Sequence, residues 1–174
     1  PCVAHGLAVA STTLRTLLQG KLAEARTLLS LSEVFVDPGN GEFVLLEAMR
    51  DLCRLGPQAA PLLVKSFSAM LAKVDDKRAA VRQAVVDATD EMVRRSDRFA
   101  FEALLPTLLA ALDARRSPAM KSQALRLLRL CWQGDGAAAV ARKLPQLLPV
   151  VVALLPETSL EVRTAAEEAT DVLL

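Results

Sequence analysis

The segment RKLPQLLPVVVALLPETSLEVRTAAEEATDVLL, residues 142–174, shows the plan on which this chain is built. Its first half is apolar and contains three prolines, a short polar break follows Pro156, and the second half is charged but has an apolar period of its own. Two other stretches follow the same plan, APLLVKSFSAMLAKVDDKRAAVRQAVVDATDEMV (60–93) and EALLPTLLAALDARRSPAMKSQALRLLRLCW (102–132). Corresponding prolines and basic residues recur about 40 residues apart, so the chain contains a repeat of that length.

The second half of each unit has the apolar spacing of an amphipathic helix. At 100° per residue its apolar residues fall on one side, and many of them are alanines, which would let neighbouring helices approach closely. In the three units these residues are Val81, Ala84, Val85, Ala88 and Met92; Met120, Ala124, Leu127, Leu128 and Cys131; and Val162, Ala165, Ala166, Ala169 and Leu173. The first halves are more evenly apolar, as expected for helices that are covered on more than one side.

Two helices in each unit of about 40 residues are the pattern of HEAT-type solenoids. We therefore predict an all-α fold, an α-solenoid of HEAT-type helical hairpins with about four repeats and right-handed stacking. In this prediction residues 1–174 form a single HEAT-repeat domain. Its approximate units are 1–35, 43–56 with a preceding helix, 60–95, 101–132 and 142–174.

The polar breaks contain helix-start signals. Ser117 followed by Pro118 predicts an N-cap residue and the first residue of a helix. In the preceding unit, Asp75 or Asp76 can cap the helix that follows. Each break is therefore expected to separate the two helices of a hairpin.

The three prolines of the last unit are expected to mark helix ends. Pro145 can occupy the first helical position, where its missing N–H costs little. Pro149 falls about one turn later and is expected to kink the helix. Pro156 ends that helix, and Thr158 with Glu161 has the spacing of a capping box that starts the next one.

Composition argues against several classes of protein. Of the 174 residues 52% are apolar, and no run of 18 apolar residues occurs, so neither a disordered chain nor a membrane span is expected. The cysteines Cys2, Cys53 and Cys131 are widely spaced, and no pair has the spacing of metal ligands. Because Cys53 and Cys131 fall in apolar helical stretches, we expect buried free thiols and a reducing compartment.

Three motifs carry a resemblance to a known family. They are FEALLPTLLAALD, KSQALRLLRL and VARKLPQLLPVVVALLPETSLEVRTAAEEAT. Through them, residues 101–174 resemble the N-terminal HEAT region of fungal-type translation elongation factor 3, and a weaker match runs back to about Phe43. The related segment of the general-control translational activator is also similar. The resemblance implies a cytoplasmic translation factor whose HEAT solenoid docks on the ribosome, with ATPase cassettes elsewhere. This chain contains no cassette.

The net charge of +1 conceals a local excess of positive charge. Between residues 115 and 143 the single acid Asp135 accompanies seven basic residues, which are Arg115, Arg116, Lys121, Arg126, Arg129, Arg142 and Lys143. Lys and Arg neutralise phosphate without reading sequence, so these seven form our candidate contact set for ribosomal RNA or ribosomal protein. Contact with another acidic protein surface, or simple solvation of the charges, remain alternatives.

The sequence contains no constellation that predicts chemistry. His5 has no carboxylate near it in sequence, and GDGAAAVARK (134–143) lacks the spacing of a phosphate-binding loop and follows a helix. Glu167 and Glu168 are neighbours about 100° apart on a helix, which does not pair them. Trp132 is expected to pack against the next repeat. We predict no catalytic residue, no metal ligand, no cofactor and no small-molecule substrate.

These observations favour a non-catalytic docking module of a ribosome-associated elongation factor in the cytoplasm. A generic HEAT scaffold or adaptor for protein partners outside translation is the alternative. Because the last helix ends in apolar residues without a stop signal, we also expect a longer natural chain, or a partner, to cover that helix. We do not expect contact with a membrane.

Overall fold

The computed structural model describes residues 46, 49–51, 53–54, 60–96, 98–134 and 136–173. In these ranges the elements are α-helices and one 3-10 helix, and there is no strand. They are α4 (Ala60–Leu71), the 3-10 helix η2 (Ala72–Asp75), α5 (Ala79–Arg94), α6 (Arg98–Ala111), α7 (Pro118–Gln133), α8 (Ala137–Val152) and α9 (Leu160–Leu173). The predictions for 1–35 and for Cys2 and His5 lie outside the described residues.

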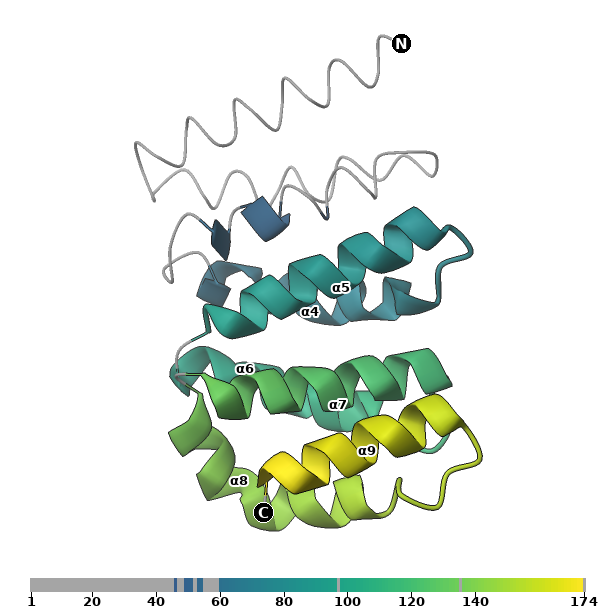
Figure 1. Ribbon diagram of the computed structural model, residues 1–174. Coiled ribbons are helices and arrows are strands. Elements are labelled where there is room, and N and C mark those ends of the chain that lie inside the picture. The colour runs from purple at the N-terminus through teal and green to yellow at the C-terminus, as the bar shows by residue number, and fades with distance from the viewer. Residues whose placement is uncertain are drawn as a thin grey trace, which may run out of the picture.

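The helices form three hairpins stacked in two layers (Figure 1). Helices α4, α6 and α8 make up the first layer, and α5, α7 and α9 the second; neighbours contact each other within each layer and within each hairpin. The turns inside the hairpins, residues 76–78, 112–117 and 153–159, lie along one edge, on the right in Figure 1, and we call this the hairpin-turn edge. The predicted all-α solenoid of helical hairpins is confirmed.

The core lies between the two layers and continues between neighbouring helices of the second layer. Helix α7 lies between α5 and α9, so that Ala124, Leu125, Leu127 and Leu128 are all fully buried. Alanines at the contact surfaces, such as Ala88 and Ala166, allow this close approach, as the sequence predicted. Upstream, Leu46, Met49 and Cys53 are helical and buried, as expected for the apolar helical stretch around Cys53.

One of the predicted helix caps is confirmed. Ser117 has extended backbone angles, its hydroxyl accepts a hydrogen bond from the Met120 amide at 3.2 Å, and Pro118 begins α7. The same hydroxyl donates to Asp75 Oδ2 at 2.6 Å. Ser117 therefore caps its own helix and also links its turn to that of the preceding hairpin.

Two other predicted caps are wrong. Helix α5 begins at Ala79 after Arg78, without a side-chain cap, because the carboxylate of Asp76 already accepts from the amide and the guanidinium of Arg78. Helix α9 begins at Leu160, so Ser159 and not Thr158 precedes its first residue. The Ser159 carbonyl accepts the first helical hydrogen bond, from the Arg163 amide.

The prediction that Pro145 starts a helix is also wrong. Helix α8 begins at Ala137, after Gly136, and both Pro145 and Pro149 lie inside it. Each proline lacks an N–H group, so the carbonyl four residues earlier has no amide partner and the helix bends. Figure 1 shows that α8 changes direction along its length. Pro156 lies in the turn beyond the helix end, close to the expected place.

Candidate interaction surface

The seven predicted contact residues lie at three places in the fold. Arg115 and Arg116 belong to the turn between α6 and α7, three others lie on α7, and the last two lie on α8. Arg142 contacts Glu102 in the first half of α6, whereas Arg115 follows the end of α6. The structure therefore separates the seven residues and does not gather them in one patch.

Lys121 is buried in the interior of the solenoid. Only 5% of its side chain is exposed, and its ammonium group lies 2.5 Å from Oε1 of Glu157 in the next hairpin turn. A buried ammonium without a partner would be strongly unfavourable, so this ion pair is part of the fold. Because its buried ammonium group is bound by Glu157, we remove Lys121 from the contact set.

Arg126 belongs to a polar network between α5 and α7. Its guanidinium donates twice to Oδ2 of Asp90, at 2.5 and 3.1 Å, and Gln123 donates to Oδ1 of Asp90 at 3.1 Å. Gln123 also donates to the hydroxyl of Thr89 at 3.0 Å, and that hydroxyl donates to the carbonyl of Val85. The charge of Arg126, although 47% of its side chain is exposed, is thus largely engaged by Asp90.

Arg129 and Arg142 also bind acids of the neighbouring hairpin. Arg129 pairs with Glu168 on α9, and Arg142 Nη2 lies 2.9 Å from Oε1 of Glu102 on α6. The partners of these two arginines are 39 and 40 residues away in sequence. The excess of positive charge between residues 115 and 143 was counted within that segment alone. It left out these acids because they belong to the adjacent repeats.

The turn between α6 and α7 holds two exposed members of the set. The side chain of Arg115 is 94% exposed, and its Nε lies 4.0 Å from the carboxylate of Asp113, at the limit of an ion pair. Arg116 is exposed, and its Nε–H donates to the carbonyl of Ala110 at 3.3 Å, which leaves both terminal nitrogens free to bind. Both residues belong to the hairpin-turn edge.

The same edge carries basic residues that the predicted contact set omitted. Lys77 is exposed in the turn before α5, and Arg163 is exposed in the first turn of α9. Arg82 is exposed as well, but its guanidinium donates to the carbonyls of Asp76 and Lys77 at 2.8 and 3.0 Å. The repeat of about 40 residues aligns Arg82 and Arg163 with Lys121, but this alignment could not show which of the three is exposed.

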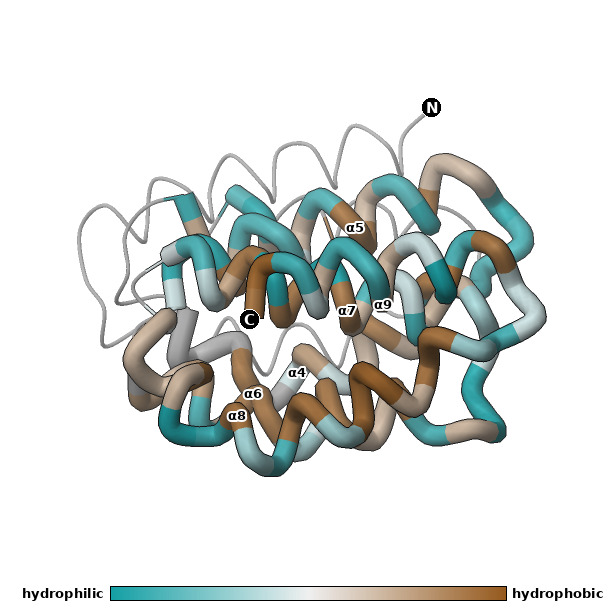
Figure 2. Tube along the Cα trace, turned by 60° about the horizontal axis from the view of Figure 1, so that its bottom comes forward, coloured by the Kyte–Doolittle hydropathy of each residue, from teal (hydrophilic) through white to brown (hydrophobic). Residues whose placement is uncertain are grey.

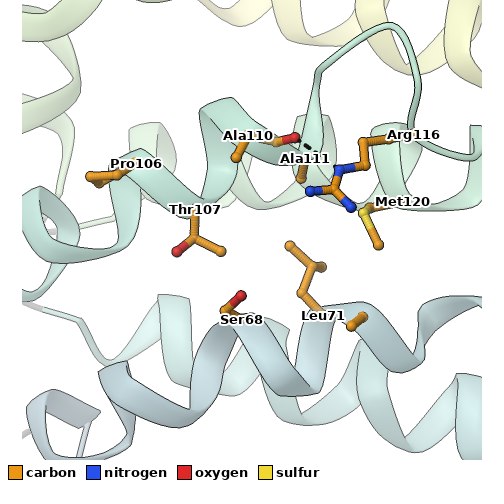
Figure 3. A pocket seen from close by; sticks show the side chains of 9 residues that line it. Ser68, Leu71, Pro106, Thr107, Ala110, Ala111, Arg116 and Met120 are labelled. Carbon is orange, nitrogen blue, oxygen red and sulfur yellow. Dashed lines mark hydrogen bonds between the residues drawn. The ribbon is translucent and has the colours of Figure 1, made fainter.

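A cavity of about 260 Å³ lies between α4 and α6 in the first layer. Figure 3 shows Ser68 and Thr107 facing each other from the two helices, with Leu71 and Met120 along one wall and Arg116 at one end. The cavity therefore combines an apolar wall, two hydroxyl groups and a cation.

A larger groove, of about 590 Å³, lies between α7 and α9 in the second layer. Its charged residues are Arg126, Arg129, Glu161 and Glu168, so the two signs are balanced. Leu160, which is 67% exposed, lies at its border. Because its arginines are already paired, this groove presents no excess of positive charge to a polyanion.

No reactive centre is found in the part of the chain that the structure describes. Cys53 and Cys131 are free and buried, and burial raises the pKa of each thiol to about 12, so both are protonated at neutral pH. The described residues include no group of three or more potential metal ligands from His, Cys, Asp and Glu. None of the described helices is long and apolar enough to cross a membrane.

Comparisons with known proteins give the family. The protein-family model described as EF3 N-terminal HEAT repeat matches residues 12–170 of this chain. Among solved structures, a designed armadillo repeat protein has a TM-score of 0.53 and 16% identity, over 95% of this chain and 74% of that chain. Another, in complex with the peptide (KR)4, has a TM-score of 0.49 and 14% identity, over 96% and 92% of the two chains. The first of these shows the repeat fold alone.

A comparison with curated protein sequences gives no match. The family model nevertheless spans most of the chain, and the helical hairpins, the repeat of about 40 residues and the three motifs agree with it. A HEAT repeat domain is a helical scaffold and not a catalytic fold. This chain belongs to the EF3 N-terminal HEAT repeat family.

Proposed function

We propose that this chain is a non-catalytic docking module of a ribosome-associated translation elongation factor that acts in the cytoplasm. Membership of the EF3 N-terminal HEAT repeat family supports the link to translation. The observation that carries the proposed contact is the exposure of Arg115 and Arg116 at the hairpin-turn edge, away from the ion pairs that join the repeats. Any ATPase activity of the full factor would belong to other domains.

The chemistry of this edge favours the phosphate backbone of ribosomal RNA as the group that is bound. A guanidinium group can donate two parallel hydrogen bonds to one phosphate, and it stays charged at every physiological pH. Lys77 and Arg163 extend the positive charge to the neighbouring turns. Contacts to phosphate are independent of base sequence, so the proposed site positions the module on an RNA surface without reading bases.

Co-sedimentation with purified ribosomes tests this function. We expect the wild-type chain to pellet with ribosomes at low salt and to dissociate as the salt concentration rises, because phosphate contacts release counterions. The double variant Arg115→Gln/Arg116→Gln should pellet at least several-fold less. A chain that fails to pellet at low salt would contradict the docking function and would favour the adaptor alternative.

The matched control removes the same amount of charge at the other edge. Arg94 ends α5 and is exposed, and Arg95 beside it is bound to Glu91 at 3.1 Å. Arg94→Gln/Arg95→Gln should therefore keep wild-type pelleting. Equal loss in both double variants would show that net charge alone drives the association. The melting temperatures of both variants are measured in parallel. Values equal to that of the wild type exclude unfolding as the cause of reduced pelleting.

A further inference from the structure

The exposed sides of the two layers differ in chemistry. Figure 2 shows mostly hydrophobic colour along α6 and α8, and much hydrophilic colour along α5 and α9. The exposed residues of α6 whose side chains are described are Phe99, Glu102, Ala103, Pro106 and Ala110, and those of α8 are Ala138, Ala141, Arg142, Pro145, Gln146, Pro149 and Val152. By contrast, six of the seven exposed residues of α9 are polar or charged, and Leu160 is the exception. The exposed face of α6 and α8 is therefore mainly apolar.

This apolar face extends over two neighbouring helices and includes large side chains. Helices α6 and α8 contact each other. Phe99 is 71% exposed and Val152 is 44% exposed. The solvent side of a surface helix is normally polar. Large exposed apolar patches on a protein mark interaction sites. The face thus has the composition of an interface.

The cavity between α4 and α6 opens on the same face. Pro106 and Ala110 belong both to the exposed residues of α6 and to the lining of the cavity. Its volume of about 260 Å³ exceeds the roughly 150 Å³ that already admits a benzene-sized ring. One aliphatic or aromatic side chain therefore fits against Leu71 and Met120 (Figure 3).

The charges around this face have one predominant sign. Arg116 lies at the end of the cavity, and Arg142 and Lys143 lie on α8. The acid among the exposed residues of α6 and α8 is Glu102, which is already bound to Arg142. The hydroxyls of Ser68 and Thr107 can donate hydrogen bonds inside the cavity. A ligand that combines an apolar side with carboxylates would complement this face.

We propose that this face of the first layer, from the cavity across α6 to α8, binds an amphipathic acidic helix of a partner protein. An apolar side chain of that helix fills the cavity, and its carboxylates lie against Arg116 at the end of the cavity. This is the helix-in-groove mode, in which apolar residues at i, i+3, i+4 and i+7 anchor the ligand. The site is additional to the proposed ribosome contact, although Arg116 borders both.

Two designed peptides of about 18 residues, long enough to be helical, serve as probes. Both carry Leu and Phe at i, i+3, i+4 and i+7; the other positions are mainly Glu in one peptide and Lys in its counterpart. Fluorescence anisotropy with the full chain should show that the Glu peptide binds at least about tenfold more tightly than the Lys peptide. Equal affinity for the two peptides, or no binding of the Glu peptide up to about 1 mM, overturns the proposal.

Variants then locate the bound peptide. Ala110→Phe fills the cavity entrance from an exposed position and should weaken binding of the Glu peptide about tenfold. Thr164→Phe introduces the same side chain at an exposed position on α9, beside the other groove, and should leave the affinity unchanged. If Ala110→Phe binds as the wild type does, the cavity is not the site and the proposal is wrong. Ribosome pelleting of Ala110→Phe should remain normal, so that this proposal and the docking function can fail separately.

Discussion

At the scale of single residues, repeat position does not determine the role of a side chain. Arg82, Lys121 and Arg163 are equivalent by the period of about 40 residues. Arg82 binds the carbonyls of its own turn, Lys121 is buried against Glu157, and Arg163 is exposed. The sequence could align these residues but could not tell which is buried, because the acid that binds Lys121 comes from the following hairpin turn.

The Lys121–Glu157 pair should contribute measurably to stability. Breaking a buried ion pair costs about 3–5 kcal/mol and an exposed one about 0–1 kcal/mol. Since Glu157 is 27% exposed, we expect Lys121→Met to lower the free energy of unfolding in urea by about 2 kcal/mol. A double-mutant cycle with Glu157→Gln should give a coupling energy of about 1 kcal/mol or more.

The control cycle uses Arg129→Gln and Glu168→Gln. Glu168 is 52% exposed, so this pair should show a coupling energy below about 1 kcal/mol. A coupling energy near zero for Lys121 and Glu157, measured in the same urea titrations, would contradict the buried ion pair.

The carboxyl group of Asp76 should titrate at low pH. Hydrogen bonds from the side chain and the amide of Arg78 lower its pKa from 3.8 to about 2. Because the folded-state pKa lies below the unfolded one, the stabilising contribution is present above about pH 4 and is lost as the pH falls toward 2. NMR titration should give a midpoint near 2, and Arg78→Gln should raise it.

Arg82→Gln is the matched control for that titration, because Arg82 binds the backbone carbonyl of Asp76 and not its carboxylate. The midpoint should stay near its wild-type value. A wild-type midpoint near 4, the usual value for Asp, would show that Arg78 does not hold the carboxylate.

At the scale of helices, the apolar period predicted the helix positions better than the predicted cap residues did. It placed α5, α7 and α9 correctly, because burial of one face determines that spacing whatever the ends do. The cap at Ser117 was predicted, whereas those at Asp76 and Thr158 were not realised. An N-cap competes with other partners of the same side chain, and here Arg78 occupies the carboxylate of Asp76.

Helix α8 shows why prolines can mislead. Two interior prolines suggested that the helix starts at Pro145, but the alanine-rich segment from Ala137 begins it and the helix bends. The cost of an interior proline is mainly one lost hydrogen bond and a local kink, which a curved solenoid can absorb. Sequence alone could not weigh this cost, because it depends on packing against α6.

The close contact between α7 and α9 should tolerate no extra volume. Ala166 is fully buried on α9, which packs along α7. Ala166→Leu should lower the free energy of unfolding by about 1–3 kcal/mol, because three additional carbon atoms cannot be placed without moving a helix. Glu167→Leu, at the adjacent exposed position, should change it by less than about 0.5 kcal/mol. Chemical denaturation that finds Ala166→Leu as stable as the wild type would contradict this packing.

At the scale of the whole molecule, ion pairs between hairpins account for most of the apparent basic surface. Asp90 binds Arg126, Glu168 binds Arg129, and Glu157 binds Lys121, each across a boundary between neighbouring repeats. The fold class and the family could be read from the sequence because they follow from local periodicity and short motifs. The contact surface could not, since the balancing charges become visible only when the repeats are stacked.

The hairpin-turn edge therefore remains as the proposed ribosome contact. It is tested most directly by comparing Arg115→Gln/Arg116→Gln with Arg126→Gln/Arg129→Gln in ribosome co-sedimentation across a salt series. Both variants remove two positive charges from the same predicted contact set. We expect the first to bind more weakly, with a salt dependence that is reduced by about one to two released counterions, and the second to bind as the wild type does. Normal ribosome binding by the first variant, together with loss of binding by the second, would contradict a contact at the hairpin-turn edge.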